Sequence, residues 1–308
     1  MTQGKVLIID GNNLLHRVYW TACNLQNSTQ IKHIFLFLNT LKSYVELFNP
    51  RKIIVCWDYR EKSTENYRKI LDENYKAQRD VEKVQLVYKY MPIINKLLDT
   101  LGVTQINPLA LEADDIIFWL STQVYPNQSI IVTTDTDLYQ LIDTNLPGNV
   151  IYNPKKKREI TPLFLKECFN VNNGFEFILQ KALKGDKADN LAGVKGIRST
   201  KIQDIISILN TNYDLDVLVK ADLLKEEELE RFKHNLSMMK FNIDLISEEE
   251  KAWYQECLDK PKETSKEDFT LLIKELEFWN IYRKIDYWFK TFNRIDFTDV
   301  FSTLFNFE

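Results

Sequence analysis

The sequence predicts an α/β fold built on parallel strands, and two observations support this prediction. Short runs of valine and isoleucine alternate with segments of helical periodicity. Such runs are typical of parallel strands that are buried on both faces of a sheet. In addition, three of the runs end in aspartate, at Asp10, at Asp58, and at Asp135 with Asp137. Because parallel strands present their carboxyl ends along one edge, where open α/β sheets bind ligands, we expect these four carboxylates to converge.

The predicted elements alternate regularly over the first half of the chain. Strands are expected at residues 5–10, 52–57, 103–106, 129–133 and 149–152, and helices at 31–48, 84–101, 112–124, 138–142 and 175–183. A further helix follows the first strand after the turn Gly11-Asn12-Asn13. The alternation stops near Thr161, and the rest of the chain has helical patterns. We therefore expect a domain boundary near residue 165, between units 1–165 and 166–308.

The composition excludes several classes of protein. The chain has 308 residues and a formal net charge of −4, which argues against a general basic nucleic-acid binder. Its four cysteines are widely spaced and its three histidines are not spaced as a metal pair, so neither a zinc site nor a disulfide scaffold is indicated. No charged-then-apolar leader opens the chain, and no apolar run approaches the roughly 20 residues that span a bilayer. We expect a soluble, cytoplasmic protein with no membrane contact.

Three acidic residues, Glu112, Asp114 and Asp115, stand within four positions at the predicted start of a helix. Acidic side chains in a first helical turn complement the helix dipole, and a single aspartate can cap a helix. For each residue taken alone, this structural interpretation remains open. Together with the four aspartates at the strand ends, however, they predict a pocket too negative to exist without cations. Its oxygen ligands favour Mg²⁺ or Mn²⁺.

Two basic regions accompany these acids. The polar segment 59–83 lacks an apolar stripe, and a long polar insertion at the active edge of a sheet is usually functional or disordered. If residues 75–79 are helical, Lys76 and Arg79 lie on one helical face. The second region is the run 155–158, four basic residues that we interpret as a solvated turn.

Glycine is scarce, with eight in the chain, yet three of them fall between residues 185 and 196. Glycine is placed where the backbone takes positive φ or approaches a ligand closely. A turn between Gly193 and Gly196, followed by a helix, would expose backbone N–H groups to a phosphate. Nearby basic residues are Lys181, Lys184, Lys187, Lys195, Arg198 and Lys201.

These motifs resemble those of the structure-specific 5′ nuclease family, the 5′→3′ exonucleases and flap endonucleases. The resemblance is greatest to the stand-alone bacteriophage members with ribonuclease H activity. The motifs occur in the family's order: IIDGNN at 8–13, CWD at 56–58, YKAQR at 75–79, LEADD at 111–115, TTDTDLYQL at 133–141 and LKGDKADNLAGVKGI at 183–197. Two residues depart from the family pattern, Gln78 where asparagine is common and Arg198 where the hairpin usually has glycine.

The resemblance implies a fold and a metal site. The implied fold is a PIN-like Rossmann-type sheet flanked by helices, with a helical arch at about residues 59–90. A helical C-terminal domain would carry a helix-hairpin turn at about residues 184–208. Two Mg²⁺ ions, replaceable by Mn²⁺, are implied. Asp58, Glu112 and Asp114 would hold one ion, Asp135, Asp137 and Asp186 the second, and Asp10, Asp115 and Asp189 would act through water. A potassium ion at the hairpin turn is also part of the family pattern.

The resemblance further implies roles in DNA cleavage. Lys76 and Arg79 would reach the scissile phosphate, and Tyr75 would either stack on a base or pack the arch. Gly193, Lys195, Gly196, Arg198 and Lys201 would bind the duplex backbone. The implied substrates are 5′ flaps, nicked or branched DNA and RNA primers in RNA–DNA duplex, cut by a monomer.

The final residues, 302–308, resemble the Leu-Phe-x-Phe tails by which phage replication proteins bind their sliding clamp. The alternative for this segment is a hydrophobic end that docks on the body of the protein.

Two other functions are compatible with parts of this sequence. A PIN-like ribonuclease shares an acidic sheet edge, but the block at residues 183–197 argues against it. A non-catalytic binder of DNA structures would be expected to lack some of the acids, whereas every expected position is filled. The sequence leaves open the preference for exonuclease or endonuclease cleavage, and for DNA or RNA.

Overall fold

A computed structural model of the chain describes residues 4–25, 31–58, 66–78, 80–142, 148–261 and 263–293. Its centre is a six-stranded sheet with the order β3-β2-β1-β4-β5-β6. The strands are β1 (Val6–Asp10), β2 (Lys52–Cys56), β3 (Thr104–Ile106), β4 (Ser129–Val132), β5 (Val150–Asn153) and β6 (Arg158–Ile160). The first five are parallel, and β6 returns antiparallel to β5. The predicted α/β fold on parallel strands is confirmed.

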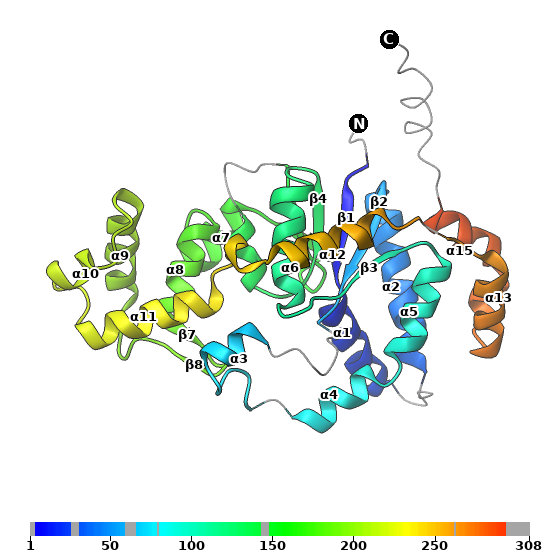
Figure 1. The fold of residues 1–308 in the computed structure, drawn as a ribbon, viewed down its shortest axis with the longest axis horizontal. Helices are drawn as coiled ribbons and strands as arrows, with labels where there is room; N and C mark the ends of the chain where they lie inside the picture. The colour runs from blue at the N-terminus through cyan, green and yellow to red at the C-terminus, as the bar shows by residue number, and fades with distance from the viewer. Residues whose placement is uncertain are drawn as a thin grey trace, which may run out of the picture.

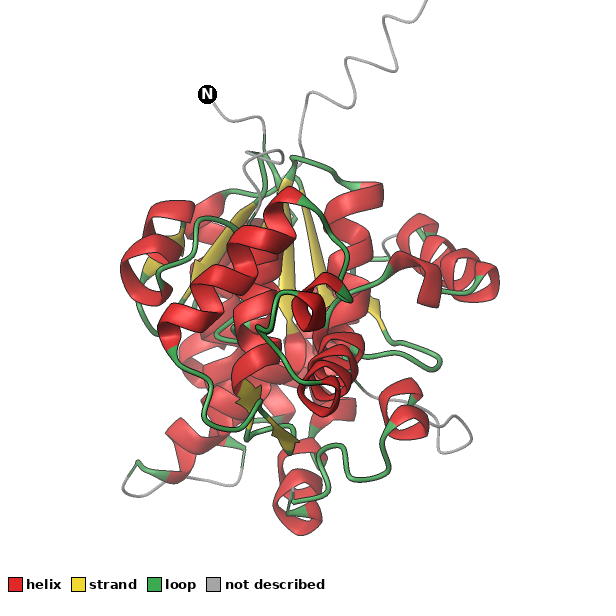
Figure 2. Cartoon of the chain, turned by 90° about the vertical axis from the view of Figure 1, so that its left-hand side faces the viewer, coloured by secondary structure: helices red, strands yellow, loops and turns green. Residues whose placement is uncertain are grey.

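Helices cover both faces of this sheet (Figures 1 and 2). Alternate residues of β1 explain why there are two cores: Leu7 and Ile9 belong to one, whereas Val6 and Ile8 belong to the other. The first core receives side chains from α1 (Gly11–Cys23), α2 (Lys32–Phe48), α4 (Val81–Tyr88), α5 (Met91–Thr100), α13 (Lys266–Glu275), α14 (Trp279–Tyr282) and α15 (Ile285–Phe292). The second receives them from α6 (Ala113–Trp119), α7 (Pro162–Phe169), α8 (Gly174–Lys184), α9 (Ser199–Thr211), α10 (Val217–Lys220), α11 (Glu226–Met239) and α12 (Glu248–Asp259).

Smaller elements complete the described chain. They are α3 (Tyr67–Leu71), a π-helical turn η1 (Leu120–Val124), the 3₁₀ turns η2 (Asp137–Leu141) and η3 (Ile243–Leu245), and a two-stranded ladder of β7 (Gly185–Asp186) and β8 (Leu191–Ala192). In Figure 1, α3, α4, β7 and β8 lie at the same end of the molecule as the start of α1. This end carries the carboxyl ends of the parallel strands.

The strand order reverses between β1 and β4, because β2 and β3 lie on one side of β1 and β5 and β6 lie beyond β4. Such a reversal is the switch point at which open α/β sheets bind ligands. Asp10 is the last residue of β1, and Asp135 follows β4 closely. Gly11 lets α1 begin directly against the end of β2, since an added Cβ would lie 2.6 Å from the Trp57 ring and 2.8 Å from the Cys56 carbonyl oxygen.

Several predicted elements differ in detail. The helix expected at 84–101 is two helices, with the break at Lys89 and Tyr90, because α5 starts afresh with proline in its first turn. The helix expected at 112–124 widens into η1 after Trp119. β6 was not predicted, and the exposed basic run 155–158 forms the turn that joins β5 to β6 together with the first residue of β6, Arg158. Asn153 Oδ1 stabilises that turn by accepting hydrogen bonds from the amides of Lys155 and Lys156, each at 3.0 Å.

The C-terminal half contributes one buried carboxylate and part of the core. Glu250 lies in the acidic segment 214–268, yet it is buried and accepts hydrogen bonds from Ala110 N and Tyr254 Oη, each at 3.1 Å. The aromatic residues Trp288 and Phe292 of α15 belong to the first core. Both cores combine residues from before and after residue 165, and a domain boundary there stays a prediction. Among the described helices, none is long and apolar enough to cross a membrane.

Candidate active site

Four aspartates, Asp10, Asp58, Asp114 and Asp135, lie close together at the carboxyl edge of the sheet. Burial, with the negative charges of Asp58 and Asp135, raises the pKa of Asp10 from 3.8 to about 7. Burial raises the pKa of Asp114 well above its usual range, and Asp135, Asp10 and Asp58 add to the effect. The pKa of Asp135 is also raised by burial, against the attraction of Lys181 and Lys76. Three of the four carboxylates predicted at the strand ends, Asp10, Asp58 and Asp135, therefore lie near one another and near Asp114, and their charges would be stabilised by a cation.

Hydrogen bonds fix two of these carboxylates. Asp10 Oδ1 caps α1 by accepting the amide of Asn13 at 2.9 Å, and its Oδ2 accepts from the Thr133 hydroxyl at 2.9 Å. Asp58 Oδ1 accepts the amide of Ala113, the first residue of α6, at 2.7 Å. The capping interpretation is thus correct for Asp10, and it does not compete with a role in the pocket because the carboxylate still contributes to the cluster.

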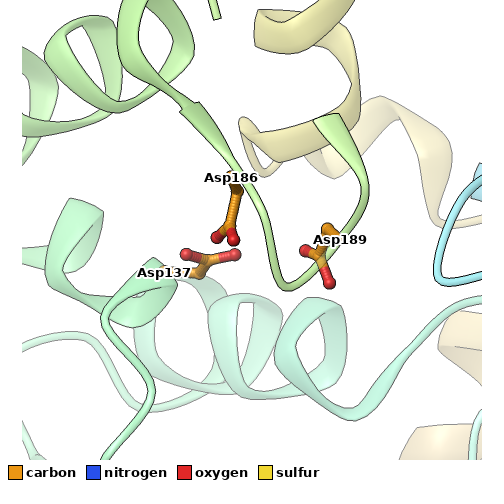
Figure 3. A group of neighbouring side chains, drawn as sticks. All are labelled: Asp137, Asp186 and Asp189. Carbon is orange, nitrogen blue, oxygen red and sulfur yellow. The ribbon is translucent and has the colours of Figure 1, made fainter. Parts of the chain in front are cut away.

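A second acidic group consists of Asp137, Asp186 and Asp189, which offer oxygen atoms within 4.8 Å of one another. Figure 3 shows the carboxylates of Asp137 and Asp186 facing each other, with Asp189 beside them. Asp137 begins η2, and the other two belong to the segment that runs from β7 toward β8. Two distant parts of the chain therefore build this group.

A lysine stands among the second group. The ammonium of Lys181, from α8, contacts the carboxylates of Asp137 and Asp186, at 2.7 Å from Asp186 Oδ2. Burial would raise the pKa of Asp186, but the hydrogen bond from Lys181 and the positive charge of Lys181 hold that pKa below the usual range. The ammonium of Lys181 thus lies between two of the predicted metal ligands and balances part of their negative charge.

Glu112 is held by four side chains of one segment, residues 66–78. Its carboxylate accepts hydrogen bonds from Asn66 Nδ2 at 2.8 Å, Arg68 Nη1 at 3.3 Å, Tyr75 Oη at 3.1 Å and Lys76 Nζ at 2.9 and 3.0 Å. Burial would raise the pKa of Glu112, but Lys76 and Arg68 together lower it to about 2. Glu112 is therefore ionised across the physiological pH range.

Asp115 is the partner of a buried arginine. Arg68 is 6 % exposed, and its Nη1 and Nη2 donate to the two oxygens of Asp115 at 2.7 and 2.9 Å. Asp115 Oδ2 also accepts the amide of Glu112 at 3.0 Å, and Glu112 and Asp115 together form a capping box at the start of α6. In this structure Asp115 thus orients the acidic turn, and the predicted role of this residue at a metal stays a prediction.

The segment 73–78 differs from the helix considered for it. It forms turns, and Lys76 takes a positive φ of 56° while its amide donates to Asp189 O at 3.2 Å. The helix on which a shared face of Lys76 and Arg79 depended is therefore not formed at residues 75–78, and Arg79 lies outside the described residues. Tyr75 is 2 % exposed, so of the two alternatives for it the structure shows packing and not a ring available to a base.

The glycine-rich turn has the predicted backbone. Gly185 and Gly196 take positive φ of 75° and 68°, and a Cβ on Gly193 would lie 2.1 Å from the Lys184 carbonyl oxygen. Nothing lies within 4 Å of a Cβ placed on Gly196. Lys195, Gly196 and Arg198 are exposed, whereas Gly193 and Lys201 are half-buried. The turn therefore presents open backbone and basic side chains immediately before α9.

Sequence reasoning missed three residues of this site. Arg68 was counted only among the basic residues of a polar segment, and nothing local marks it as buried. Lys181 was counted only as part of a basic neighbourhood, although its position on the apolar helix α8 could have indicated an inward-facing charge. The side chain of Asn12, within the quoted IIDGNN motif, was given no role, yet its Nδ2 donates to Asp58 Oδ2 at 3.0 Å.

Comparisons with known proteins agree with this geometry. Residues 5–170 match the family model described as the 5′-3′ exonuclease, N-terminal resolvase-like domain. A 5′-3′ exonuclease from Buchnera aphidicola subsp. Schizaphis graminum is 32% identical over 197 residues, which is 62% of this chain and 66% of that protein. A 5′-3′ exonuclease from Bacillus subtilis (strain 168) is 31% identical over 208 residues, 64% of this chain and 68% of that protein. The matched region thus spans about two thirds of these relatives.

The fold is shared with solved structures. The bacteriophage T5 flap endonuclease, in a pseudo-enzyme–product complex with DNA and metal ions, matches with a TM-score of 0.60 and 20% identity. The match covers 92% of this chain and 99% of the T5 chain, and at this identity it shows the fold. The family model matches more than half of the chain, and two bacterial 5′-3′ exonucleases are 32% and 31% identical to it. The chain therefore belongs to the 5′-3′ exonuclease family.

Proposed function

We propose that this protein is a divalent-metal-dependent, structure-specific 5′ nuclease that hydrolyses phosphodiester bonds at 5′ ends and flaps of DNA. The observation that carries the proposal is the charge arrangement at the switch point of the sheet. Buried aspartates there have raised pKa values, next to a group of three acids, two of which, Asp137 and Asp186, contact the ammonium of Lys181. Membership of the 5′-3′ exonuclease family supports the same reaction.

The donor set fits Mg²⁺ or Mn²⁺, because every candidate ligand is a carboxylate oxygen. We propose that Asp58, Glu112 and Asp114 serve one ion, that Asp135, Asp137 and Asp186 serve a second, and that Asp10, Asp115 and Asp189 act through water. Bound there, such ions would activate water for attack on the phosphodiester and neutralise charge on the departing oxygen.

The cationic side chains have separate proposed roles. Lys76, whose side chain is 17% exposed, lies where the acidic pocket meets the surface and would bind the scissile phosphate. Arg79 would assist it. The glycine-rich turn and the start of α9, with Gly193, Lys195, Gly196, Arg198 and Lys201, would bind the duplex backbone, with a potassium ion as in the family pattern. Contacts of this kind set position without reading sequence.

Parts of the chain outside the acidic site also have proposed roles. We propose a nuclease unit at residues 1–165, with an arch at about 59–90, and a helical DNA-binding unit at 166–308. RNA primers are a proposed second substrate, and the protein would act as a monomer. Binding of a sliding clamp through residues 302–308 stays a prediction, because that segment lies outside the described residues.

The test is cleavage of a 5′-labelled flap substrate with Mg²⁺ and with EDTA. We expect cleavage only with Mg²⁺, and none from the variant Asp135→Asn with Asp137→Asn. A matched variant, Asp259→Asn with Asp268→Asn, changes two exposed acids on α12 and α13 and should cleave as the unchanged protein does. Mg²⁺-dependent cleavage by the Asp135 and Asp137 variant would refute the site assignment, and an RNA–DNA duplex assayed in parallel decides the second substrate.

A further inference from the structure

Asn12 connects three parts of the protein through one buried side chain. It is 5 % exposed and follows Asp10 and Gly11 at the start of α1. Its Nδ2 donates to Asp58 Oδ2 at 3.0 Å, and its Oδ1 accepts the backbone amide of Asp58 at 3.1 Å. This reciprocal pair fixes both the backbone and the carboxylate of Asp58, and Ala113 N binds the other carboxylate oxygen.

The second hydrogen of the Asn12 amide points to a different element. Asn12 Nδ2 also donates to the hydroxyl of Tyr88 at 2.6 Å. Tyr88 is the last residue of α4, which lies within the region expected to form the arch. An asparagine amide has two N–H groups, so the partners found here use both of them. The position of Asn12 therefore depends on α4 as well as on β2.

Tyr88 is itself held in place from α1. Its ring packs edge-on against His16 with centroids 5.6 Å apart, and its hydroxyl lies 3.3 Å from His16 Nε2. Tyr88 is half-buried, as is His16. The hydroxyl thus has a defined direction, which a tyrosine that merely packs against a helix would not need.

We propose that Tyr88 is a positioning residue that acts through Asn12 to orient the Asp58 carboxylate, and so links the position of α4 to the metal site. A substrate that moves or fixes α4 would in this way change how well Asp58 is placed for a metal ion. The inference rests on the proposed metal site, and it assigns a link from the arch region to that site. Groups that orient metal ligands affect affinity without touching the ion.

The test is Mn²⁺ binding in the absence of DNA, measured by calorimetry and by electron paramagnetic resonance. Tyr88→Phe removes only the hydroxyl and should weaken Mn²⁺ binding by about three- to tenfold, the effect of one hydrogen bond. Asn12→Ala removes the direct bond to Asp58 and should weaken it by about 10- to 100-fold. Tyr44→Phe is the matched control, since it removes a buried hydroxyl that Arg17 of α1 binds at 2.6 Å.

A double variant separates positioning from general loss of structure. If Tyr88 acts through Asn12, then Tyr88→Phe should have no further effect on Mn²⁺ binding in the Asn12→Ala background. Thermal unfolding of the metal-free variants shows whether each one is folded. Unchanged Mn²⁺ binding by Tyr88→Phe, or additive losses in the double variant, would overturn the inference while leaving the proposed function intact. If the protein without substitutions binds no Mn²⁺, both the inference and the proposed function are overturned.

Discussion

Removing divalent ions and raising the pH from 5 to 7 should destabilise this protein through its buried aspartates. Burial raises the pKa of Asp10 from 3.8 to about 7, and it also raises the pKa values of Asp114 and Asp135. In the unfolded chain these groups ionise near pH 4. The folded protein therefore holds more protons than the unfolded chain between about pH 4 and 7, and its free energy of unfolding falls as the pH rises through that window.

Glu112 acts in the opposite direction, but at lower pH. Lys76 and Arg68 overcome the effect of burial and lower its pKa from 4.5 to about 2, so its contribution to stability is gained as the pH rises through that interval. Above about pH 5 this contribution is constant. For Asp10 alone, a pKa that moves from 3.8 to about 7 corresponds to about 4 kcal/mol. Because domains are typically stable by about 5–15 kcal/mol, we expect the decrease in the free energy of unfolding between pH 5 and 7 to be clearly measurable.

The measurement is urea unfolding, followed by tryptophan fluorescence, at pH 5, 6 and 7 in EDTA and in excess Mg²⁺. Excess Mg²⁺ should abolish the decrease in the free energy of unfolding between pH 5 and 7, since the metal binds the ionised carboxylates of the folded state. Asp10→Asn keeps a good helix cap for α1 but cannot ionise, so its stability should fall less between pH 5 and 7. A free energy of unfolding that stays constant or rises over this range in EDTA would refute the reasoning.

Three further changes test the cations. Arg68→Ala leaves Asp115 buried without its partner and should lower the free energy of unfolding by about 3–5 kcal/mol. Urea titrations measure this loss, and a loss below about 1 kcal/mol would be inconsistent with the buried pair. Lys181→Ala should make the metal-free protein less stable. The same variant should bind Mn²⁺ more tightly in calorimetry, because the Lys181 ammonium no longer competes with the metal ion for the carboxylates of Asp137 and Asp186. Weaker Mn²⁺ binding would show that Lys181 assists the metal. Lys76→Ala should lower the single-turnover cleavage rate far more than DNA affinity, and equal losses would make Lys76 a docking residue.

The sequence was sufficient for the five parallel strands and most of the acids because both depend on short-range signals. Valine and isoleucine runs mark buried strands, and an aspartate directly after such a run, as at Asp10 and Asp58, lies at the strand's carboxyl edge whatever the loops do. The start of α6 at Ala113 was predictable for a similar reason, since acidic residues favour a first turn. The family motifs then connected these positions with Asp186 and Asp189.

The contacts of the basic side chains in the site were harder to predict, because their partners lie far away in the sequence. Arg68 binds Asp115 across 47 positions and the Met238 carbonyl across 170, so no local pattern separates it from an exposed arginine. The bond from Asn12 to Tyr88 spans 76 positions and has the same difficulty. The break between α4 and α5 was visible in principle, since Pro92 favours a new helix start. The turn at residues 73–78 was not, because its conformation is fixed by contacts with residues 187–190.

The ion pairs between residues 66–78 and 112–115 bear on which substitutions this protein can accept. Arg68 and Lys76 come from one stretch and their carboxylate partners from another, so a change of charge in only one stretch leaves a buried or half-buried partner uncompensated. A charge change at Arg68 should therefore be tolerated only together with a compensating change at Asp115, although the two residues lie in separate stretches of the sequence.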